Sequence, residues 1–205
     1  SVRDWARTQT GNERTTELRR RHARWFLEVA ERCDRGLRTT AEAAAHRRLA
    51  DATSDIGRAV DWALEHDPGV AASFIVALGH YGYTRLWSAP VDWARRAVAD
   101  AAGDLDPAPF AVLAADAAHR MRFDDAERLA TSALTSLLPA ARAFALEVLS
   151  DTAVYQGDLT GASRLFDTFV KVGHSGQHIR IADDSAFKLD DQLQRAISFA
   201  TLNQG

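Results

Sequence analysis

Cysteine and long apolar runs are both scarce in this sequence of 205 residues. Cys33 is the single cysteine, which excludes an intramolecular disulfide and is typical of a reducing compartment, so we expect a cytoplasmic protein. No segment approaches the ~20 consecutive apolar residues of a membrane-spanning helix, and none has the pattern of a signal peptide. A reactive thiol would need a neighbouring base, for which the sequence has no candidate, so we interpret Cys33 as a small apolar residue.

An excess of basic charge is missing as well. The formal net charge is −3, whereas a domain that grips nucleic acid usually carries a basic surface. The densest basic segment, residues 19–22, is flanked by glutamates on the same predicted helix, which indicates a solvated, salt-bridged face. We therefore expect no direct binding of nucleic acid by this chain.

Motifs of phosphate binding and catalysis are absent too. The sequence has no Gly-rich loop that ends in Gly-Lys-Ser/Thr, no Gly-x-Gly-x-x-Gly and no nucleophile elbow around a serine. His174 and His178 are four residues apart and could bind zinc on a helix, but Gly176 between them indicates a solvated turn. We expect no catalytic residue, no cofactor and no metal in this chain, which we interpret as a non-enzyme.

Helical periodicity, by contrast, is nearly continuous, and no segment alternates as a strand would. Much of the apolar content is alanine, the strongest helix former. The dipeptide Asp67-Pro68 ends one helix, and residues 106–109 have the composition of a linker. The pattern predicts helices at about 13–33, 41–65, 69–86, from 88–90 onward, and at 109–120, 123–137, 140–155, 159–173 and 186–202.

An internal repeat lies in the second half of the chain. Segments 90–98, 126–134 and 162–170 align at an offset of 36 residues, which makes Trp93, Leu129 and Leu165 equivalent. A period near 34 residues with two helices in each unit is the tetratricopeptide pattern. We predict an all-α fold in which antiparallel helix pairs stack as a tetratricopeptide-like right-handed superhelix. A plain helix bundle with a chance period is the alternative.

An aromatic cluster marks the candidate site. His80, Tyr81, Tyr83 and Trp87 surround the glycines Gly79 and Gly82. One interpretation is a patch that contacts a ligand or partner. The other is a core junction between the N-terminal helices and the repeats, and it is favoured because aromatic side chains dominate core burial.

Several segments together resemble a known arrangement: RHARWFLEVAE at 21–31, AVDWALE at 59–65, Trp87 with WARRAV at 93–98, and SVRDWA at 1–6. Their order and spacing are similar to the helical region of large bacterial signal-transduction ATPases, the LuxR-type, MalT-like and antibiotic-regulatory transcriptional regulators. The segment at 52–57, ATSDIG, departs from the acidic, Asn-containing stretch that is usual there.

The resemblance implies both domain boundaries and a role. Residues 1–12 would end a preceding winged-helix domain, 13–87 would form a helical junction, and 88–205 would hold the repeats with a capping helix. Such a chain belongs to a longer protein whose own domains bind ATP. It would sense a protein partner or small effector, contact the neighbouring domains, and could form homo-oligomers. The alternatives are the same scaffold in an ATPase-linked nucleotide cyclase and a stand-alone protein-interaction repeat protein.

Overall fold

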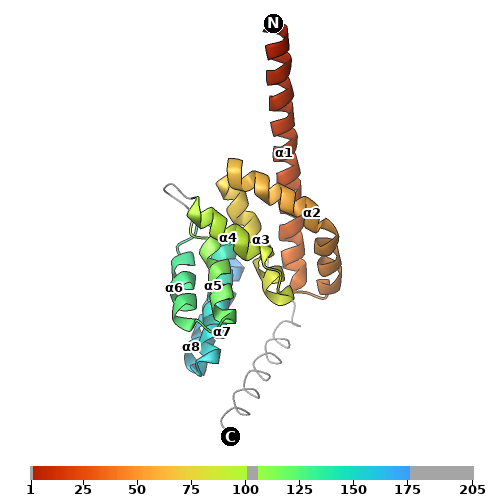
Figure 1. Ribbon diagram of the computed structural model, residues 1–205. Helices are drawn as coiled ribbons and strands as arrows, with labels where there is room; N and C mark the ends of the chain where they lie inside the picture. Colours follow the sequence, from red (N-terminus) through yellow and green to blue (C-terminus); the bar gives the residue numbers. More distant parts are fainter. Residues whose placement is uncertain (1, 101–105, 176–205) are drawn as a thin grey trace.

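The computed structural model describes residues 2–100 and 106–175, with side chains placed for 14–100 and 106–169. All the regular structure in these residues is helical, so the fold is all-α (Figure 1). None of the described helices is long and apolar enough to span a bilayer. The helices are α1 (Val2–Leu37), α2 (Glu42–His66), α3 (Pro68–Arg85), α4 (Ala89–Ala99), α5 (Pro109–His119), α6 (Phe123–Ala133), α7 (Pro139–Tyr155) and α8 (Leu159–Ser175).

The predicted helices lie close to the observed ones, with differences at two places in the described part of the chain. Helix α1 runs without a break through the boundary that we placed between residues 12 and 13. The predicted boundary between a winged-helix domain at 1–12 and the helical junction therefore falls inside one helix. The assignment of residues 1–12 to such a domain stays a prediction. Helix α6 ends at Ala133, earlier than predicted. The helix predicted at 186–202 lies outside the described residues.

The early end of α6 has a long-range cause. The Asp106 carboxylate accepts hydrogen bonds from the Ser136 hydroxyl at 2.5 Å and from the Leu137 backbone N–H at 3.0 Å. It also accepts a bond from the backbone N–H of Ala108, at the start of α5, at 2.9 Å. The Asp106 side chain, 30 residues from Ser136, thus accepts hydrogen bonds from the α6–α7 connection. These bonds compete with those of a continuing helix, so α6 ends before them.

The turns inside three helix pairs share one backbone geometry. One residue in each turn has a positive φ: Leu86 at 54°, Met121 at 58° and Gly157 at 84°. The next residue then donates its backbone N–H to the carbonyl five residues earlier, at 2.9–3.0 Å: Trp87 to Gly82, Arg122 to Ala117 and Asp158 to Ala153. This is the Schellman ending of a helix. The pairs α3–α4, α5–α6 and α7–α8 therefore turn in the same way.

The helices pack with α5 near the centre. Helix α5 contacts α3, α4, α6 and α7, while α1 contacts α2 and α3. The buried face of α5 is mostly alanine, including Ala111, Ala114 and Ala117, each with no exposed surface. Such small side chains let neighbouring helix backbones approach closely. The composition that favoured helices thus also sets their spacing.

Two glycines allow α3 to pack tightly against its neighbours. A Cβ on Gly79 would lie 2.7 Å from the Phe144 ring and 3.0 Å from Val112 Cγ2. A Cβ on Gly82 would lie 2.9 Å from Pro90 Cγ and 3.0 Å from the Trp87 carbonyl oxygen. These residues weaken α3 as an isolated helix, but they open the space that α5, α7 and the start of α4 occupy.

Candidate functional site

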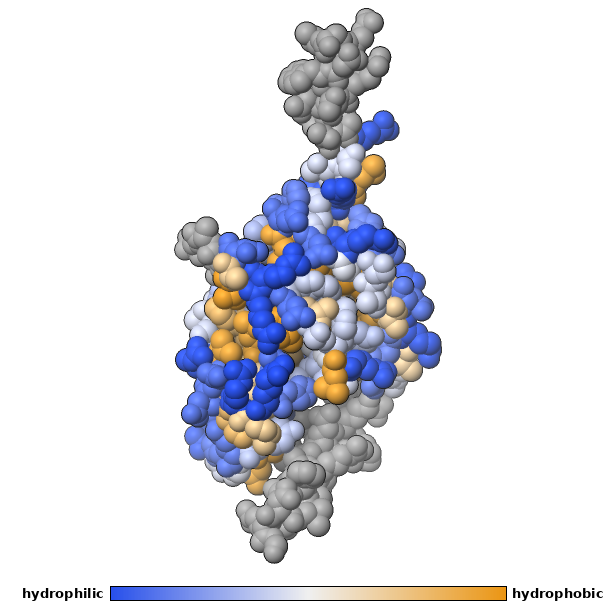
Figure 2. Space-filling view, viewed as in Figure 1, coloured by the Kyte–Doolittle hydropathy of each residue, from blue (hydrophilic) through white to orange (hydrophobic). Residues whose placement is uncertain are grey.

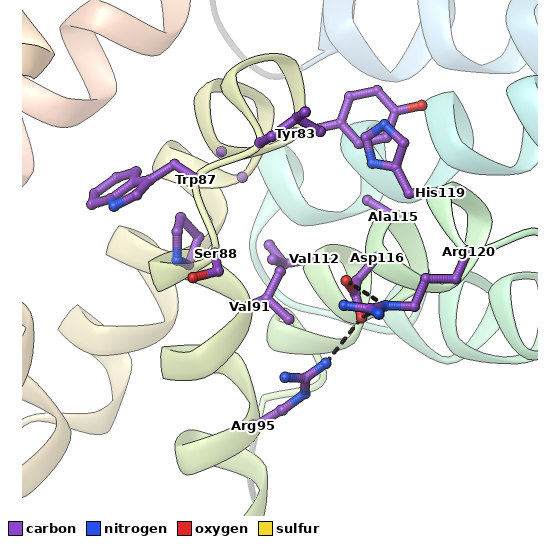
Figure 3. Close-up of a pocket in the computed structure, with 14 residues that line it drawn as sticks. Tyr83, Trp87, Ser88, Val91, Arg95, Val112, Ala115, Asp116, His119 and Arg120 are labelled. Atoms are coloured by element: carbon purple, nitrogen blue, oxygen red, sulfur yellow. Dashed lines mark hydrogen bonds and ion pairs between the residues drawn. The ribbon is translucent and has the colours of Figure 1, made fainter.

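A pocket of about 310 Å³ lies where the α3–α4 turn meets α4 and α5 (Figure 3). Val91 on α4 and Val112 and Ala115 on α5 form its apolar floor. Tyr83 contributes an aromatic wall, and Arg95, Asp116 and Arg120 line its polar side. Trp87 also lines the pocket, but its ring is directed away from it and packs edge-on against Trp93 (Figure 3). In Figure 2 an apolar area beside strongly hydrophilic side chains covers this region of the surface.

The polar side of the pocket is organised around one carboxylate. Arg95 Nη2 donates to Asp116 Oδ2 at 3.0 Å, and Arg120 Nε donates to both Asp116 oxygens at 3.0 and 3.1 Å. The Asp116 side chain is only 13% exposed, whereas those of Arg95 and Arg120 are 53% and 61% exposed. Two guanidinium groups thus converge on a single, nearly covered acid (Figure 3).

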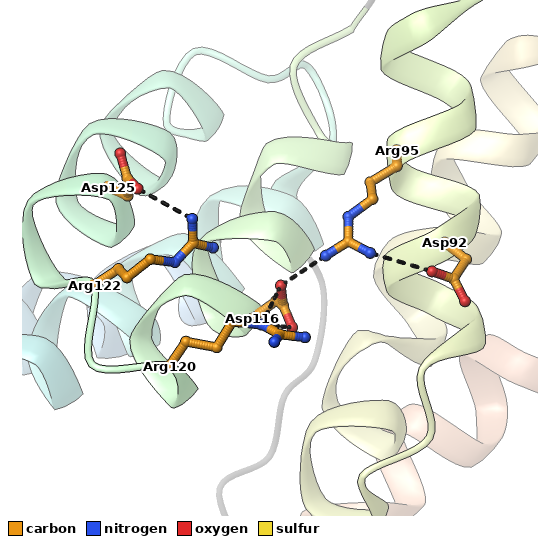
Figure 4. A network of polar contacts seen from close by, with 6 residues as sticks. All are labelled: Asp92, Arg95, Asp116, Arg120, Arg122 and Asp125. Carbon is orange, nitrogen blue, oxygen red and sulfur yellow. Dashed lines mark hydrogen bonds and ion pairs between the residues drawn. The ribbon is translucent and has the colours of Figure 1, made fainter.

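Further ion pairs extend from this point across the surface (Figure 4). Arg95 also contacts Asp92 on its own helix at 3.3 Å. On α6, Asp125 accepts from Arg122 at 3.3 Å and from Arg128 at 2.9 Å. These outer pairs are solvent-exposed and contribute little to stability. Of the arginines in these outer pairs, Arg95 lines the pocket and Arg122 and Arg128 do not.

The four residues of the predicted patch do not form one surface. Tyr83 and Trp87 line the pocket, and the Tyr83 ring stacks on His119 with centroids 4.0 Å apart. Tyr81 lies against His46 on α2, with ring centroids 5.4 Å apart, and its ring packs edge-on against that of Trp87 at 5.7 Å. His80 is directed toward α7, where its Nδ1 lies 3.6 Å from Glu147 Oε1. Whether the patch binds a ligand stays a prediction.

His80 belongs to a second polar cluster, between the end of α1, α3 and α7. Arg38 Nη2 donates to Glu147 Oε2 at 2.9 Å across 109 residues of sequence. Burial raises the pKa of Asp34 to about 6 and that of Asp151 to about 7. Burial also acts to raise the pKa of Glu147, but the Arg38 charge and then the His80 charge outweigh it and lower that pKa.

Two smaller predictions concern single residues. Cys33 is 7% exposed and burial raises the pKa of its thiol, which confirms its interpretation as a buried apolar residue. Glu17 pairs with Arg20 at 2.8 Å and with Arg21 at 2.7 Å, so the basic segment is salt-bridged as expected. The candidate histidines His174 and His178 lie outside the residues with described side chains.

The sequence held few signals for the polar residues of either site. Arg95 and Asp116 are 21 residues apart and Arg38 and Glu147 are 109 apart, so no local spacing pairs them. Asp92–Arg95 has the i, i+3 spacing of neighbours on one helix face, and the Asp116–Arg120 pair has the i, i+4 spacing. A search for i, i+4 pairs of opposite charge would have found the Asp116–Arg120 pair, but not its place beside a pocket.

Comparisons with protein-family models, curated proteins and solved structures find no match for this chain.

Proposed function

We propose that this chain is a helical-repeat binding module, the sensor region of a bacterial signal-transduction ATPase that regulates transcription. One observation supports the helical-repeat part of the proposal: the same turn recurs at Leu86, Met121 and Gly157, so the chain repeats a helix pair at nearly constant spacing. The regulator part rests on the resemblance of the segments at 21–31, 59–65 and 93–98. Repeated helix pairs build extended surfaces for binding, because each unit buries its apolar face against the next one.

The contacts between helices support tetratricopeptide-like stacking within this proposal. The first helices of the three pairs, α3, α5 and α7, contact one another. The second helices, α4, α6 and α8, have no Cα atoms within 8 Å of each other in the described part of the chain. An array that is close-packed on one side and open on the other is curved, and we propose the right-handed superhelix of such repeats.

The proposed mechanism is a population shift. The sensor module holds a partner or effector that prefers one arrangement of the stacked helices, and this preference biases the ATPase switch of the parent protein. The ligand can change the switch only by its difference in affinity for the two states. ATP binds the parent's nucleotide-binding domain in this proposal, and this chain acts in the cytoplasm without contacting DNA.

The test is made on the full-length protein that contains this chain. We expect a Walker-type loop upstream of it, and ATP turnover that changes at least ten-fold when residues 88–175 are deleted. Nucleotide binding by the deletion variant is measured in parallel, because retained binding shows that the remaining domains are folded. A parent without a nucleotide-binding domain, or with unchanged turnover despite intact nucleotide binding, would refute the proposal.

A further inference from the structure

We propose that the pocket between α3, α4 and α5 is an effector site for a small carboxylic acid with a flat apolar body, such as an aromatic acid. The regulatory role of the ligand rests on the proposed function, but its binding to the pocket does not and can be tested by itself. Three observations carry it: the size of the pocket, its apolar floor with one aromatic wall, and the arginines on its polar side.

The size of the pocket favours a small molecule over an extended peptide. Its volume is about 310 Å³, at the lower end of the range for small-molecule sites. A bicyclic ring system with one substituent fits within such a space. A peptide would need a longer groove with exposed main-chain donors or acceptors along it, and the lining here consists of helix side chains and one short turn.

The floor and wall favour a flat apolar body. Val91 is partly exposed and offers its methyl groups, whereas Val112 and Ala115 are each only 3% exposed and form the covered base of the pocket. The Tyr83 ring is already held by its stack on His119, so it need not be ordered when a ligand binds. Burial of an apolar ring against preformed surfaces of this kind is favourable without much conformational cost.

The arginines favour a carboxylate at the other end of the ligand. Asp116 already occupies the space between Arg95 and Arg120 (Figure 3), so a ligand carboxylate would bind the outer donors of these arginines. Among the described residues Arg120 uses only its Nε, so both of its terminal nitrogens have no partner there. A guanidinium with spare parallel N–H donors matches a carboxylate in geometry and charge.

The probe is 2-naphthoate, and the matched control ligand is 2-naphthamide, which has the same shape without the charge. Binding to the whole chain is measured by titration calorimetry. We expect naphthoate to bind at least ten-fold more tightly than naphthamide. Equal binding of the two, or binding of neither, would overturn the proposal.

Variants then test the position of the site. Arg120→Gln should reduce the preference for naphthoate to less than three-fold, whereas Arg128→Gln, which alters an arginine outside the pocket, should leave it unchanged. Val91→Phe should fill the pocket and weaken both ligands at least ten-fold. If Arg128→Gln has the larger effect, or if Val91→Phe binds as the natural chain does, the ligand sits elsewhere and the proposal fails.

The variant Asp116→Asn tests whether the arginines, and not only the apolar surface of the pocket, bind the ligand. Removing the Asp116 carboxylate frees Arg120 and one of the two contacts of Arg95, which keeps its pair with Asp92. Naphthoate should therefore bind at least three-fold more tightly while naphthamide is unaffected. Weaker naphthoate binding in this variant would contradict the role of the two arginines.

These binding tests are independent of the regulator proposal. A parent protein without an ATPase would refute the proposed function and leave this binding site intact.

Discussion

At the residue scale, two glycines show that the effect of adding a Cβ on stability depends on the atoms around it. Gly57 lies inside α2, and a Cβ there would meet no atom within 4 Å. A Cβ on Gly82 would meet the Pro90 ring and a backbone carbonyl oxygen that cannot move aside. One position is free to gain helix propensity, and the other is fixed by packing.

We predict opposite effects of alanine at these two positions. Gly57→Ala should raise the free energy of unfolding by about 0.5–1 kcal/mol, because alanine loses less backbone entropy on folding. Gly82→Ala should lower it by about 1–3 kcal/mol, because overpacking forces neighbouring atoms apart. Urea unfolding followed by circular dichroism measures both. A stabilised Gly82→Ala would show that α3 and α4 are less tightly packed than described.

Asp151 has a strongly raised pKa in the folded chain. Its pKa of about 7 in the folded chain lies above the ordinary value of 3.8, so the folded state holds a proton that the unfolded chain has released. The free energy of unfolding therefore falls as the pH rises between these two values. Asp34 acts in the same direction between 3.8 and about 6. His80 opposes both, because burial lowers its pKa and stability is lost as its ring is protonated.

We predict that Asp151→Asn flattens this dependence. The variant should gain about 1 kcal/mol of stability relative to the natural chain when the pH is raised from 5 to 8. This gain in stability is smaller than the full pKa shift of Asp151 would produce, because the residue is partly exposed and solvent screens its charge. Thermal or urea unfolding at both pH values measures the effect, and Asp124→Asn, on the surface at the start of α6, is the control. A gain at pH 5 equal to that at pH 8 would contradict the assigned titration.

At the scale of elements, the three shared turns place different residues in one strained conformation. Gly157 adopts a positive φ without cost, whereas Met121 and Leu86 carry side chains that disfavour it. Met121 is 64% exposed and Leu86 is 82% exposed, so neither gains much packing in return. Leu86 lies at the rim of the pocket, but Met121 has no described role beyond the turn.

We predict that Met121→Gly stabilises the chain by about 0.5 kcal/mol, since relief of the positive φ exceeds the added entropy of glycine in the unfolded state. Gly157→Ala should destabilise it by about 1 kcal/mol, because the same conformation becomes strained. Chemical denaturation of both variants measures these changes. Destabilisation by Met121→Gly would indicate that the Met121 side chain makes a contact of its own.

At the scale of the whole molecule, the Arg38–Glu147 pair joins distant parts of the chain. Within the described residues no Cα atom of α1 lies within 8 Å of α7, so the long Arg38 side chain reaches across to the α7 carboxylate. Both side chains are partly buried, at 28% and 25% exposed. The pair therefore connects the N-terminal helices directly to the third helix pair.

We predict that Arg38→Gln and Glu147→Gln each lower the free energy of unfolding by about 1–2 kcal/mol, because each leaves the other charge without its partner in a partly buried place. The double variant should lose at least about 0.5 kcal/mol less than the sum of the two single changes. A double-mutant cycle in urea measures this coupling. Strict additivity would show that the pair does not act as a unit.

Helix positions were determined largely by the sequence itself, because periodicity, proline and capping residues act over a few neighbours. Asp67, for example, accepts a hydrogen bond from the Val70 backbone N–H at 3.2 Å at the start of α3, and Pro68 follows it in the first turn. The candidate site was predicted only in part: Tyr83 and Trp87 line the pocket, and His80 and Tyr81 face elsewhere. Only the tertiary structure decided this division, and with it the convergence of Arg95 and Arg120 on Asp116, because contacts between separate helices depend on packing angles that no local pattern specifies.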